Sequence, residues 1–410
     1  MFVDESTWQF IDEHLQEDVC QLALQKKKYN DIDFEFAIQQ IQGRQKTRDK
    51  LPSMGSIPRF VFPPSLALEQ CSSEITAQYK VSFVEELLYG DVTHAVCGHR
   101  TMADLTGGFG VDALYLSGLF ETCHYVEPQP LLCDILSYNL KLVQKHNVVV
   151  HQDTMEHYLE NMDAVDFIYL DPSRRDMQGR KVSGLEDCTP NVLQYKDMLL
   201  RKADVVMLKL SPMLDIKRAL YKLPETRDVI VVAVEGECKE LVLVLTKETT
   251  GQLRYHAVNL LPEKDDFKDI KFDFTEEEEK LAVPQLSGKL HTYLYEPNAA
   301  IMKAGGFKCI ATRLNLMKLH HHSHLYTSDT LLEDFPGRIF KVQDVYTLKE
   351  AKTAMRDVKK ANVAIRNFPM CADALKKTLK LIDGGDVYLF GTTLNNGQKA
   401  IISCTKEVFI

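Results

Sequence analysis

Two kinds of hydrophobic pattern divide the chain. In the first 95 residues, apolar side chains recur at intervals of three and four, as at Trp8, Ile11 and Leu15 and again from Phe34 to Ile41, which predicts amphipathic helices. From about residue 100, short apolar runs alternate with segments of helical character, which predicts a parallel sheet covered on both faces. These runs occupy residues 102–105, 123–127, 148–153, 166–171 and 205–211.

The alternation breaks at residues 228–247, DVIVVAVEGECKELVLVLTK. Two apolar strands flank Glu235-Gly236-Glu237 with no room for a crossover helix, so they predict an antiparallel hairpin. A parallel α/β sheet that ends in one reversed strand resembles the class I methyltransferases, whose Rossmann-like sheet has seven strands. Most nicotinamide-binding Rossmann domains keep that last strand parallel.

Composition adds exclusions to this pattern. The net charge of −9 argues against a protein that coats nucleic acid through charge alone, although residues 335–410 carry 13 Lys+Arg against 7 Asp+Glu, a local balance of +6. The N-terminus lacks a signal-peptide pattern, and no apolar run reaches the ~18 residues of a membrane span. The ten cysteines form no Cys-x-x-Cys pair, which favours reduced thiols. We therefore expect a cytoplasmic protein without a membrane span.

The strongest motif is ADLTGGFGVDALYL, residues 103–116, which follows a predicted strand and opens a predicted helix. Glycines there let the backbone turn sharply and approach a ligand closely. The motif resembles the cofactor loop of S-adenosylmethionine-dependent methyltransferases, with Thr106 where a glycine is common. The cofactor-binding candidates of this loop are Asp104, Thr106, Gly107, Gly108 and Gly110.

Two further acids end the second and third predicted strands. By the same resemblance, Glu127 is placed to accept from the ribose hydroxyls, and Asp153 from the adenine amine. Any one such acid could simply solvate a loop. Three such acids, Asp104, Glu127 and Asp153, at successive strand ends beside the glycine loop favour an S-adenosylmethionine site.

The fourth strand runs into FIYLDPSRRD, residues 167–176. Asp171, Pro172, Ser173 and Arg174 resemble the Asp-Pro-Pro-aromatic motif of amino-group methyltransferases, in which the acid and the next carbonyl accept from an amine. We take these four as catalytic candidates. Here Ser173 replaces the second proline and Arg174 the aromatic residue.

Three cations near this motif are substrate-binding candidates. Arg174 and Arg175 could stack on a base or hold a phosphate, or they could pair with Asp176. Lys209, at the end of the fifth strand, could add positive charge there or be an ordinary strand-end lysine. No cysteine pair has the spacing for ring-carbon methylation of a pyrimidine, so a nitrogen acceptor is favoured.

Several motifs together resemble bacterial class I methyltransferases with a C-terminal THUMP-like domain, common in Bacteroidetes-type genomes. They are QIQGRQKTRDKLP, CSSEITAQYK, DLTGGFGVD, YLDPSRRD, LYEPNAAIMKAG and RNFPM with LKLIDGGDVYLFGTT. The resemblance implies RNA, either tRNA or rRNA, as the substrate. With the pattern of elements it predicts four regions: residues 1–95, helical; 96–250, the methyltransferase domain; 251–334, a small α+β domain with a ferredoxin-like fold as candidate; and 335–410, the THUMP-like domain.

Three other motifs stay open. Ser73 and Glu74 of CSSEITAQYK predict at least a helix cap, with a lid over the cofactor as the alternative. Glu296 and Pro297 could line the active-site rim or start a helix. The run of histidines at residues 320–324 lacks a complete ligand set, so we expect a surface or structural role and no bound metal.

The sequence therefore predicts a cytoplasmic S-adenosylmethionine-dependent methyltransferase acting on a base nitrogen of RNA. Two rivals remain at this point: a methyltransferase for a protein or a small anionic substrate, and a non-catalytic RNA-binding protein that retains the fold. The oligomeric state stays open.

Overall fold

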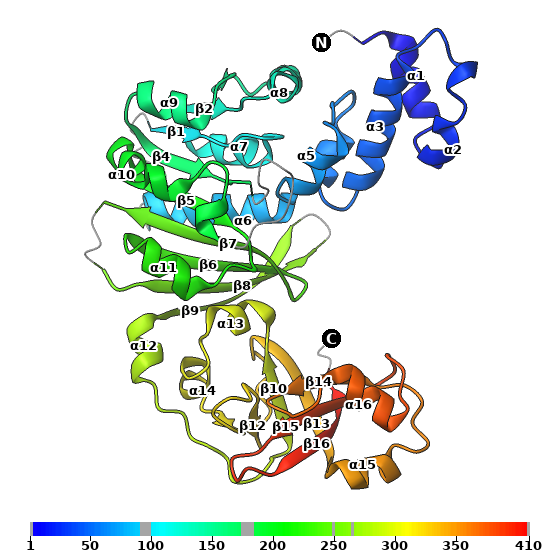
Figure 1. Cartoon of the computed structure of the whole chain (residues 1–410), viewed down its shortest axis with the longest axis vertical. Coiled ribbons are helices and arrows are strands. Elements are labelled where there is room, and N and C mark those ends of the chain that lie inside the picture. Colours follow the sequence, from blue (N-terminus) through cyan, green and yellow to red (C-terminus); the bar gives the residue numbers. More distant parts are fainter. Residues whose placement is uncertain (1–2, 91–99, 174–183, 248–250, 264–265, 408–410) are drawn as a thin grey trace. The chain divides into compact units, whose positions relative to one another are not determined.

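The computed structural model describes the chain except residues 1–2, 91–99, 174–183, 248–250, 264–265 and 408–410 (Figure 1). The chain forms two compact units. The first unit comprises residues 1–227, 241–250 and 262–267, and the second comprises residues 228–240, 251–261 and 268–410. No helix among the described residues is long and apolar enough to cross a membrane.

The first unit begins with helices, as the periodicity predicts. Trp8 and Ile11 are buried on α1, and Phe34, Ala37 and Ile41 are buried on α3, so both predicted apolar stripes face a core. The helical elements before the sheet are α1 (Glu5–Glu13), α2 (Val19–Ala23), η1 (Lys26–Lys28), α3 (Phe34–Thr47), α4 (Pro52–Ser56), α5 (Ser65–Gln70) and α6 (Glu74–Tyr89).

A larger sheet follows, with the strand order β3-β2-β1-β4-β5-β7-β6-β8-β9. Strands β1 to β5 pair in parallel, whereas β7 runs antiparallel to β5. The strands are β1 (Thr101–Asp104), β2 (Thr122–Val126), β3 (Val148–His151), β4 (Val165–Leu170), β5 (Ala203–Leu210), β6 (Thr226–Val234), β7 (Glu237–Thr246), β8 (Arg254–Pro262) and β9 (Phe267–Thr275). The predicted parallel sheet with a reversed seventh strand is therefore present.

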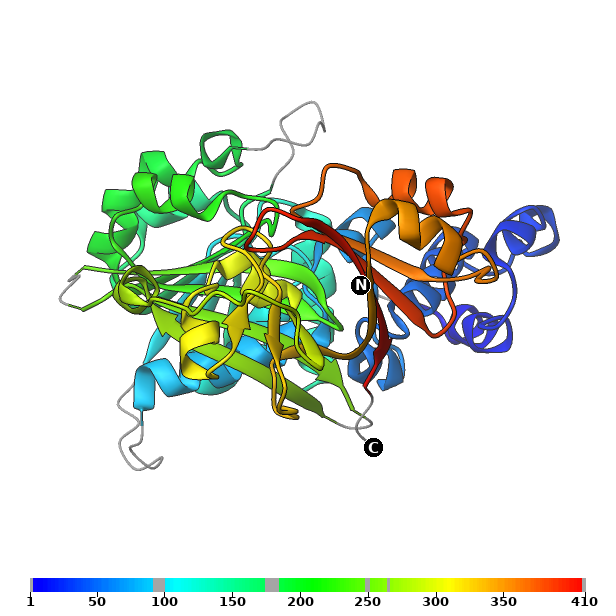
Figure 2. The same cartoon turned by 90° about the horizontal axis from the view of Figure 1, so that it is seen from below.

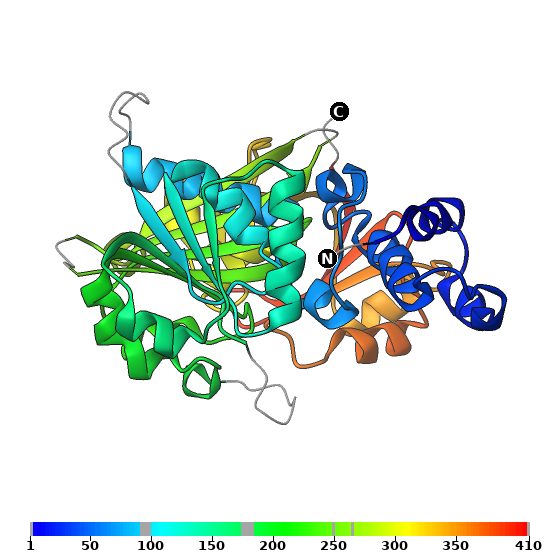
Figure 3. The ribbon, with the colours of Figure 1, turned by 90° about the horizontal axis from the view of Figure 1, so that it is seen from above.

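Helices separate these strands, and Figure 3 shows them packed along the sheet. They are α7 (Val111–Leu116), η2 (Ser117–Leu119), α8 (Pro130–Leu142), α9 (Met155–Asn161), η3 (Leu185–Asp187), α10 (Val192–Lys202) and α11 (Ile216–Lys222). Because β1 to β5 are parallel, their carboxyl ends meet at one edge of the sheet, where a ligand crevice is expected in open α/β folds.

The larger sheet differs from the prediction in its length. Seven strands were expected, and β8 and β9 extend the sheet beyond them. Strand β8, which lies in the region 251–334 that was predicted as a separate α+β domain, pairs in parallel with β6. Between β6 and β7, Glu235 and Gly236 both have positive φ, at 50° and 82°, the backbone of a two-residue type I′ hairpin turn.

The second unit also holds a smaller sheet, in the order β11-β12-β10-β13-β16-β15-β14. Its strands are β10 (Tyr293–Pro297), β11 (Met317–Lys318), β12 (Tyr326–Ser328), β13 (Gly337–Tyr346), β14 (Asn362–Arg366), β15 (Val387–Thr393) and β16 (Lys399–Lys406). Its helices are α12 (Glu276–Leu281), α13 (Ala299–Ala304), α14 (Cys309–Arg313), α15 (Leu348–Ala354) and α16 (Ala372–Leu379).

The two faces of the smaller sheet bury separate apolar clusters. Leu389 and Ile401 pack with residues of α15 and α16, the orange helices beside the red strands in Figure 2. Phe390 and Ile402 point the other way and pack with Leu294 and others. Successive residues of each strand thus serve opposite faces, as strand geometry requires.

Candidate active site

The glycine loop between β1 and α7 has the backbone that only glycine supports at its key positions. Gly110 has φ +83°, and a Cβ there would lie 2.8 Å from Leu136. A Cβ on Gly107 would lie 2.1 Å from the ring of Tyr125. Gly108, at φ +53°, donates its N–H to Glu127 at 3.0 Å. The loop is therefore held by strand β2 and its end, and it turns directly into α7.

A cavity of about 1040 Å³ lies against this loop. Small-molecule sites typically measure roughly 300–1,000 Å³, so the cavity has room for a large ligand. Nine of the predicted site residues line it: Asp104, Thr106, Gly107, Gly108, Gly110, Glu127, Asp171, Pro172 and Ser173.

Thr106, which stands where the resemblance leads one to expect a glycine, connects the two predicted motifs. Its Oγ1 accepts the backbone N–H of Asp171 at 2.6 Å. The hydroxyl therefore ties the glycine loop to the strand end that carries the Asp-Pro motif. A glycine at this position could not make that bond.

Asp104 is a buried acid in an acidic environment. Burial raises its pKa well above the usual range, the N–H of Thr106 at 3.1 Å opposes this, and the carboxylates of Asp112, Asp171 and Glu127 raise the pKa further. A cation placed beside Asp104 would relieve both effects. The environment of Asp104 thus favours a positively charged ligand.

Glu127 directly follows β2 at the same edge of the sheet and is also buried. Its Oε2 accepts from Gly108 and its Oε1 accepts the N–H of Gln129 at 2.9 Å. A carboxylate has about four acceptor positions, so further hydroxyl donors can still bind to it.

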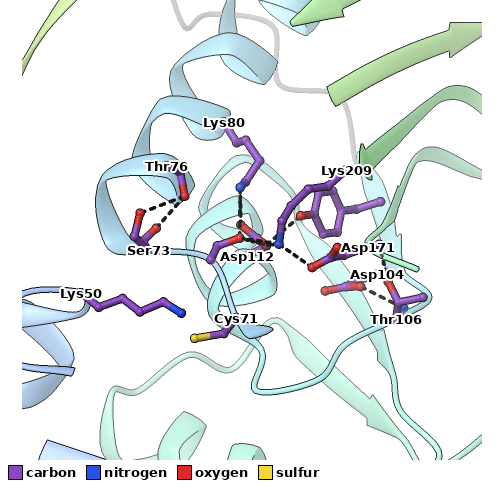
Figure 4. A network of polar contacts seen from close by, with 12 residues as sticks. Lys50, Cys71, Ser73, Thr76, Lys80, Asp104, Thr106, Asp112, Asp171 and Lys209 are labelled. Carbon is purple, nitrogen blue, oxygen red and sulfur yellow. Dashed lines mark hydrogen bonds and ion pairs between the residues drawn. The ribbon is translucent and has the colours of Figure 1, made fainter. Parts of the chain in front are cut away.

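A network of buried ions lies beside Asp171 (Figure 4). Lys209 forms an ion pair with the Asp171 carboxylate and donates to the Ser72 hydroxyl at 3.0 Å. Lys80, on α6, lies 3.0 Å from Asp112 and donates to the same hydroxyl at 3.2 Å. Ser72 in turn donates to Asp112 at 2.6 Å. The network therefore links α6, the first turn of α7, the end of β4 and β5.

Asp112 is the anionic centre of this network. Burial alone would raise its pKa, but Lys80 and then Lys209 lower it, together with the hydroxyls of Ser72 and Tyr169, to about 2. Asp112 is thus ionised at neutral pH and holds both lysines in place.

Lys209 therefore lies inside the wall of the site. Its side chain is 10% exposed and is engaged by Asp171 and Ser72, so it acts on Asp171 directly. The predicted contact between Lys209 and the substrate stays a prediction, and the structure adds a role for it in positioning Asp171.

Asp153 is not among the residues that line the cavity, where Thr154, Met155 and Glu156 are found instead. Its carboxylate is taken by His157, four residues later on the next helix, with Nδ1 at 2.7 Å, and by the N–H of Thr154. The predicted contact of Asp153 with the adenine amine stays a prediction. Arg174 and Arg175 lie outside the described residues.

The site also contains residues that sequence reasoning did not assign. Ser72 and Lys80 come from CSSEITAQYK, where the cap was the favoured interpretation. Ser73 does precede α6, but its side chain makes no capping hydrogen bond to a backbone N–H. Ser72 precedes α6, which begins at Glu74, so no helical spacing links it to Lys80 in the sequence.

The other two open motifs lie in the second unit. Glu296 and Pro297 end β10, and Asn298 caps α13, whose first residue is Ala299. Pro297 thus belongs to the strand and not to the helix. Among the described residues, no group of three or more His, Cys, Asp or Glu side chains is arranged to hold a metal ion.

Comparison with known proteins agrees with the fold. The chain matches over its whole length a crystal structure described as a “putative methyltransferase from Porphyromonas gingivalis W83”, with 31% identity, a TM-score of 0.83 and 100% of both chains covered. Residues 293–336 match a ferredoxin-like domain model and residues 337–406 a THUMP domain-like model. The fold is that of the class I methyltransferases. The chain belongs to the family of bacterial class I methyltransferases with a C-terminal THUMP-like domain, together with the Porphyromonas protein.

Weaker similarities extend to other solved structures. A “putative RNA methyltransferase” from Pyrococcus horikoshii has 15% identity and a TM-score of 0.34, over 51% of this chain and 98% of that one. A “putative methyltransferase” from Streptococcus mutans, in complex with SAH, has 12% identity and a TM-score of 0.29, over 36% and 89%. No curated protein matches the chain.

Proposed function

We propose that this protein is a cytoplasmic S-adenosylmethionine-dependent methyltransferase that modifies a base nitrogen in tRNA or rRNA. The observation that carries the proposal is the bond between Thr106 Oγ1 and the N–H of Asp171. It joins a ligand loop and an acceptor motif in one cavity.

The residues at the cavity fit the cofactor. The left-handed Gly108 and Gly110 give a loop that can approach a ligand closely. Asp104, whose pKa is raised by burial and by the neighbouring carboxylates, suits the ammonium of the amino-acid end. The free acceptor positions of Glu127 suit a ribose diol.

Bound S-adenosylmethionine supplies an electrophilic methyl group on a sulfonium. The chain's own task is to orient an amine and exclude water. Asp171 and the Pro172 carbonyl are placed at the cavity to accept hydrogen bonds from the amine, so that its lone pair faces the cofactor. Lys209 pairs with the carboxylate of Asp171 and so fixes its orientation at the cavity.

Nitrogen is favoured over a ring carbon by the state of the nearby thiols. Cys71 and Cys188 line the cavity. Burial raises the pKa of the Cys71 thiol, whereas nucleophilic attack on a pyrimidine ring requires a thiolate. The family and the +6 balance of residues 335–410 support RNA as the substrate.

The test is incubation of the full chain with radiolabelled S-adenosylmethionine and total RNA from a strain lacking the gene. We expect label in one RNA species, and none with Asp171→Ala. Asp197→Ala, whose side chain is 82% exposed, is the matched control and should leave the label unchanged. Label in protein or small molecules but not in RNA would overturn the RNA assignment.

A further inference from the structure

The smaller sheet carries a polar layer directly beside its apolar core. One apolar cluster of this sheet contains Leu294, Phe340 and Phe390, and Ala364 packs against it. Side chains two residues apart on a strand share a face. The layer therefore comprises Glu296, Arg338, Arg366 and Thr392, one from each of β10, β13, β14 and β15.

One buried carboxylate holds two arginines in this layer. The Glu296 side chain is 2% exposed; its Oε2 accepts from Arg338 Nε at 2.9 Å, and its Oε1 forms an ion pair with Arg366 Nη2 at 2.7 Å. Arg338 also lies over the ring of Phe340, with its guanidinium carbon 5.5 Å from the centroid. The arginine side chains remain 46% and 33% exposed, so the triad has one excess positive charge that solvent can reach.

Polar atoms around the triad are left without hydrogen-bond partners among the described residues. They are Arg366 Nε, Thr392 Oγ1, His324 Nδ1 and Glu296 Oε1, all buried; Glu296 Oε1 has only its ion pair with Arg366. Burial, together with the nearby Lys318, His322 and Arg366, lowers the pKa of His324 to about 4. His324 is thus neutral at pH 7, so a cationic histidine does not compete for Glu296. Native proteins leave few buried polar atoms unsatisfied.

The cationic donors of this layer come from two strands, Arg338 from β13 and Arg366 from β14. Two guanidinium groups from different strands suit a tetrahedral oxyanion, whose oxygens point in several directions. A planar carboxylate has only two oxygens, and a single guanidinium group can bind both.

We propose that Arg338 and Arg366, held by Glu296, form a binding site for a phosphate group, and that this phosphate belongs to the backbone of a bound RNA. The RNA source rests on the proposed function; the phosphate chemistry rests on the triad alone. Glu296 keeps the two guanidinium groups close together despite their repulsion. Such contacts position a nucleic acid without reading its sequence.

The experiment measures binding of fluorescently labelled total tRNA to the full chain at several salt concentrations. We compare the wild type with Arg338→Gln, Arg366→Gln and the double variant. Arg356→Gln, an exposed arginine of the same unit, is the control. Thermal unfolding and S-adenosylmethionine binding report whether each variant is folded.

We expect each glutamine variant to weaken tRNA binding about tenfold, as for the loss of a charged hydrogen bond. The slope of log K against log salt should fall by about 0.9 for each arginine. Arg356→Gln should leave both unchanged. Arg366→Lys keeps the positive charge but loses the bidentate guanidinium group. Compared with Arg366→Gln, it should restore the salt dependence of tRNA binding more fully than the affinity.

Equal tRNA affinity and equal slope in the wild type and the double variant would overturn the proposal. A second arm uses inorganic phosphate. If tRNA does not bind the wild type, but phosphate raises the melting temperature of the wild type and not of the double variant, the RNA source is wrong and the phosphate site stands. If neither ligand binds, both the site and its RNA source are wrong.

Discussion

Asp112→Asn tests the buried ion network with little change of shape. The carboxylate of Asp112 lies 3.0 Å from Lys80 and 4.0 Å from Lys209. At an effective dielectric constant of about 20, these separations correspond to roughly 5.5 and 4 kcal/mol of gross attraction. Desolvation of the ions offsets most of it, and removal of one partner from a buried pair costs about 3–5 kcal/mol. We expect the free energy of unfolding to fall by that amount.

The single tryptophan, Trp8, is buried in the first unit and reports its unfolding. Urea titrations followed by its fluorescence at pH 7 give the difference between the wild type and Asp112→Asn. Asp197→Asn, at the exposed aspartate used above, should change stability by less than about 0.5 kcal/mol.

The pH dependence provides a second readout of Asp112→Asn. Because the folded pKa of Asp112 is lowered to about 2, its contribution is fully present above the unfolded value of about 4. The contribution is lost as the pH falls through the folded pKa. The deficit of Asp112→Asn should therefore be constant above about pH 5 and shrink below pH 4. A variant as stable at pH 7 as Asp197→Asn would refute the reasoning.

Three other changes test the site. Asp104→Asn should weaken S-adenosylmethionine binding about tenfold. In the wild type, the affinity measured by calorimetry should rise with pH above about pH 4, because Asp104 ionises as the pH passes its raised pKa. The same pH profile in Asp104→Asn would contradict this role. Lys209→Met should lower kcat about 10- to 100-fold in a single-turnover assay, because Asp171 loses its positioning partner, with cofactor affinity nearly unchanged; an unaltered kcat would exclude that role. Gly110→Ala should cost about 1–2 kcal/mol in the same urea titration, because alanine at φ +83° is strained and its methyl group meets Leu136; equal stability would show that the loop relaxes freely.

Much of the fold could be predicted because buried parallel strands read as continuous apolar runs. The run at residues 166–171 is β4, Val165–Leu170, and the run at 205–211 falls within and just after β5, Ala203–Leu210. The order in which strands pair within a sheet leaves no local pattern in the sequence. This is why β8 and β9 were not assigned to the larger sheet.

The candidate site likewise contains residues that a local pattern predicts and residues that it does not. Acids at the ends of neighbouring parallel strands must meet at one edge, so the sequence could predict that Asp104, Glu127 and Asp171 lie together, and all three line one cavity. Asp153 obeys the same pattern, but a histidine one helical turn later takes its carboxylate, and only the side-chain geometry shows this.

The buried network could not be derived from pattern alone. Lys80 and Asp112 are polar residues on helices, which ordinarily face water. Their side chains are 2% and 8% exposed because α6 and α7 pack together and pair the two charges. That approach is tertiary, and no local periodicity encodes it.

The measurement that tests the central claim most directly is a calorimetric titration of the full chain with S-adenosylmethionine. The account predicts saturable binding at one site, weakened by Asp104→Asn and by Glu127→Gln and unchanged by Asp197→Asn. No binding to the wild type, or equal affinity in all four proteins, would contradict the assignment of this cavity to the cofactor.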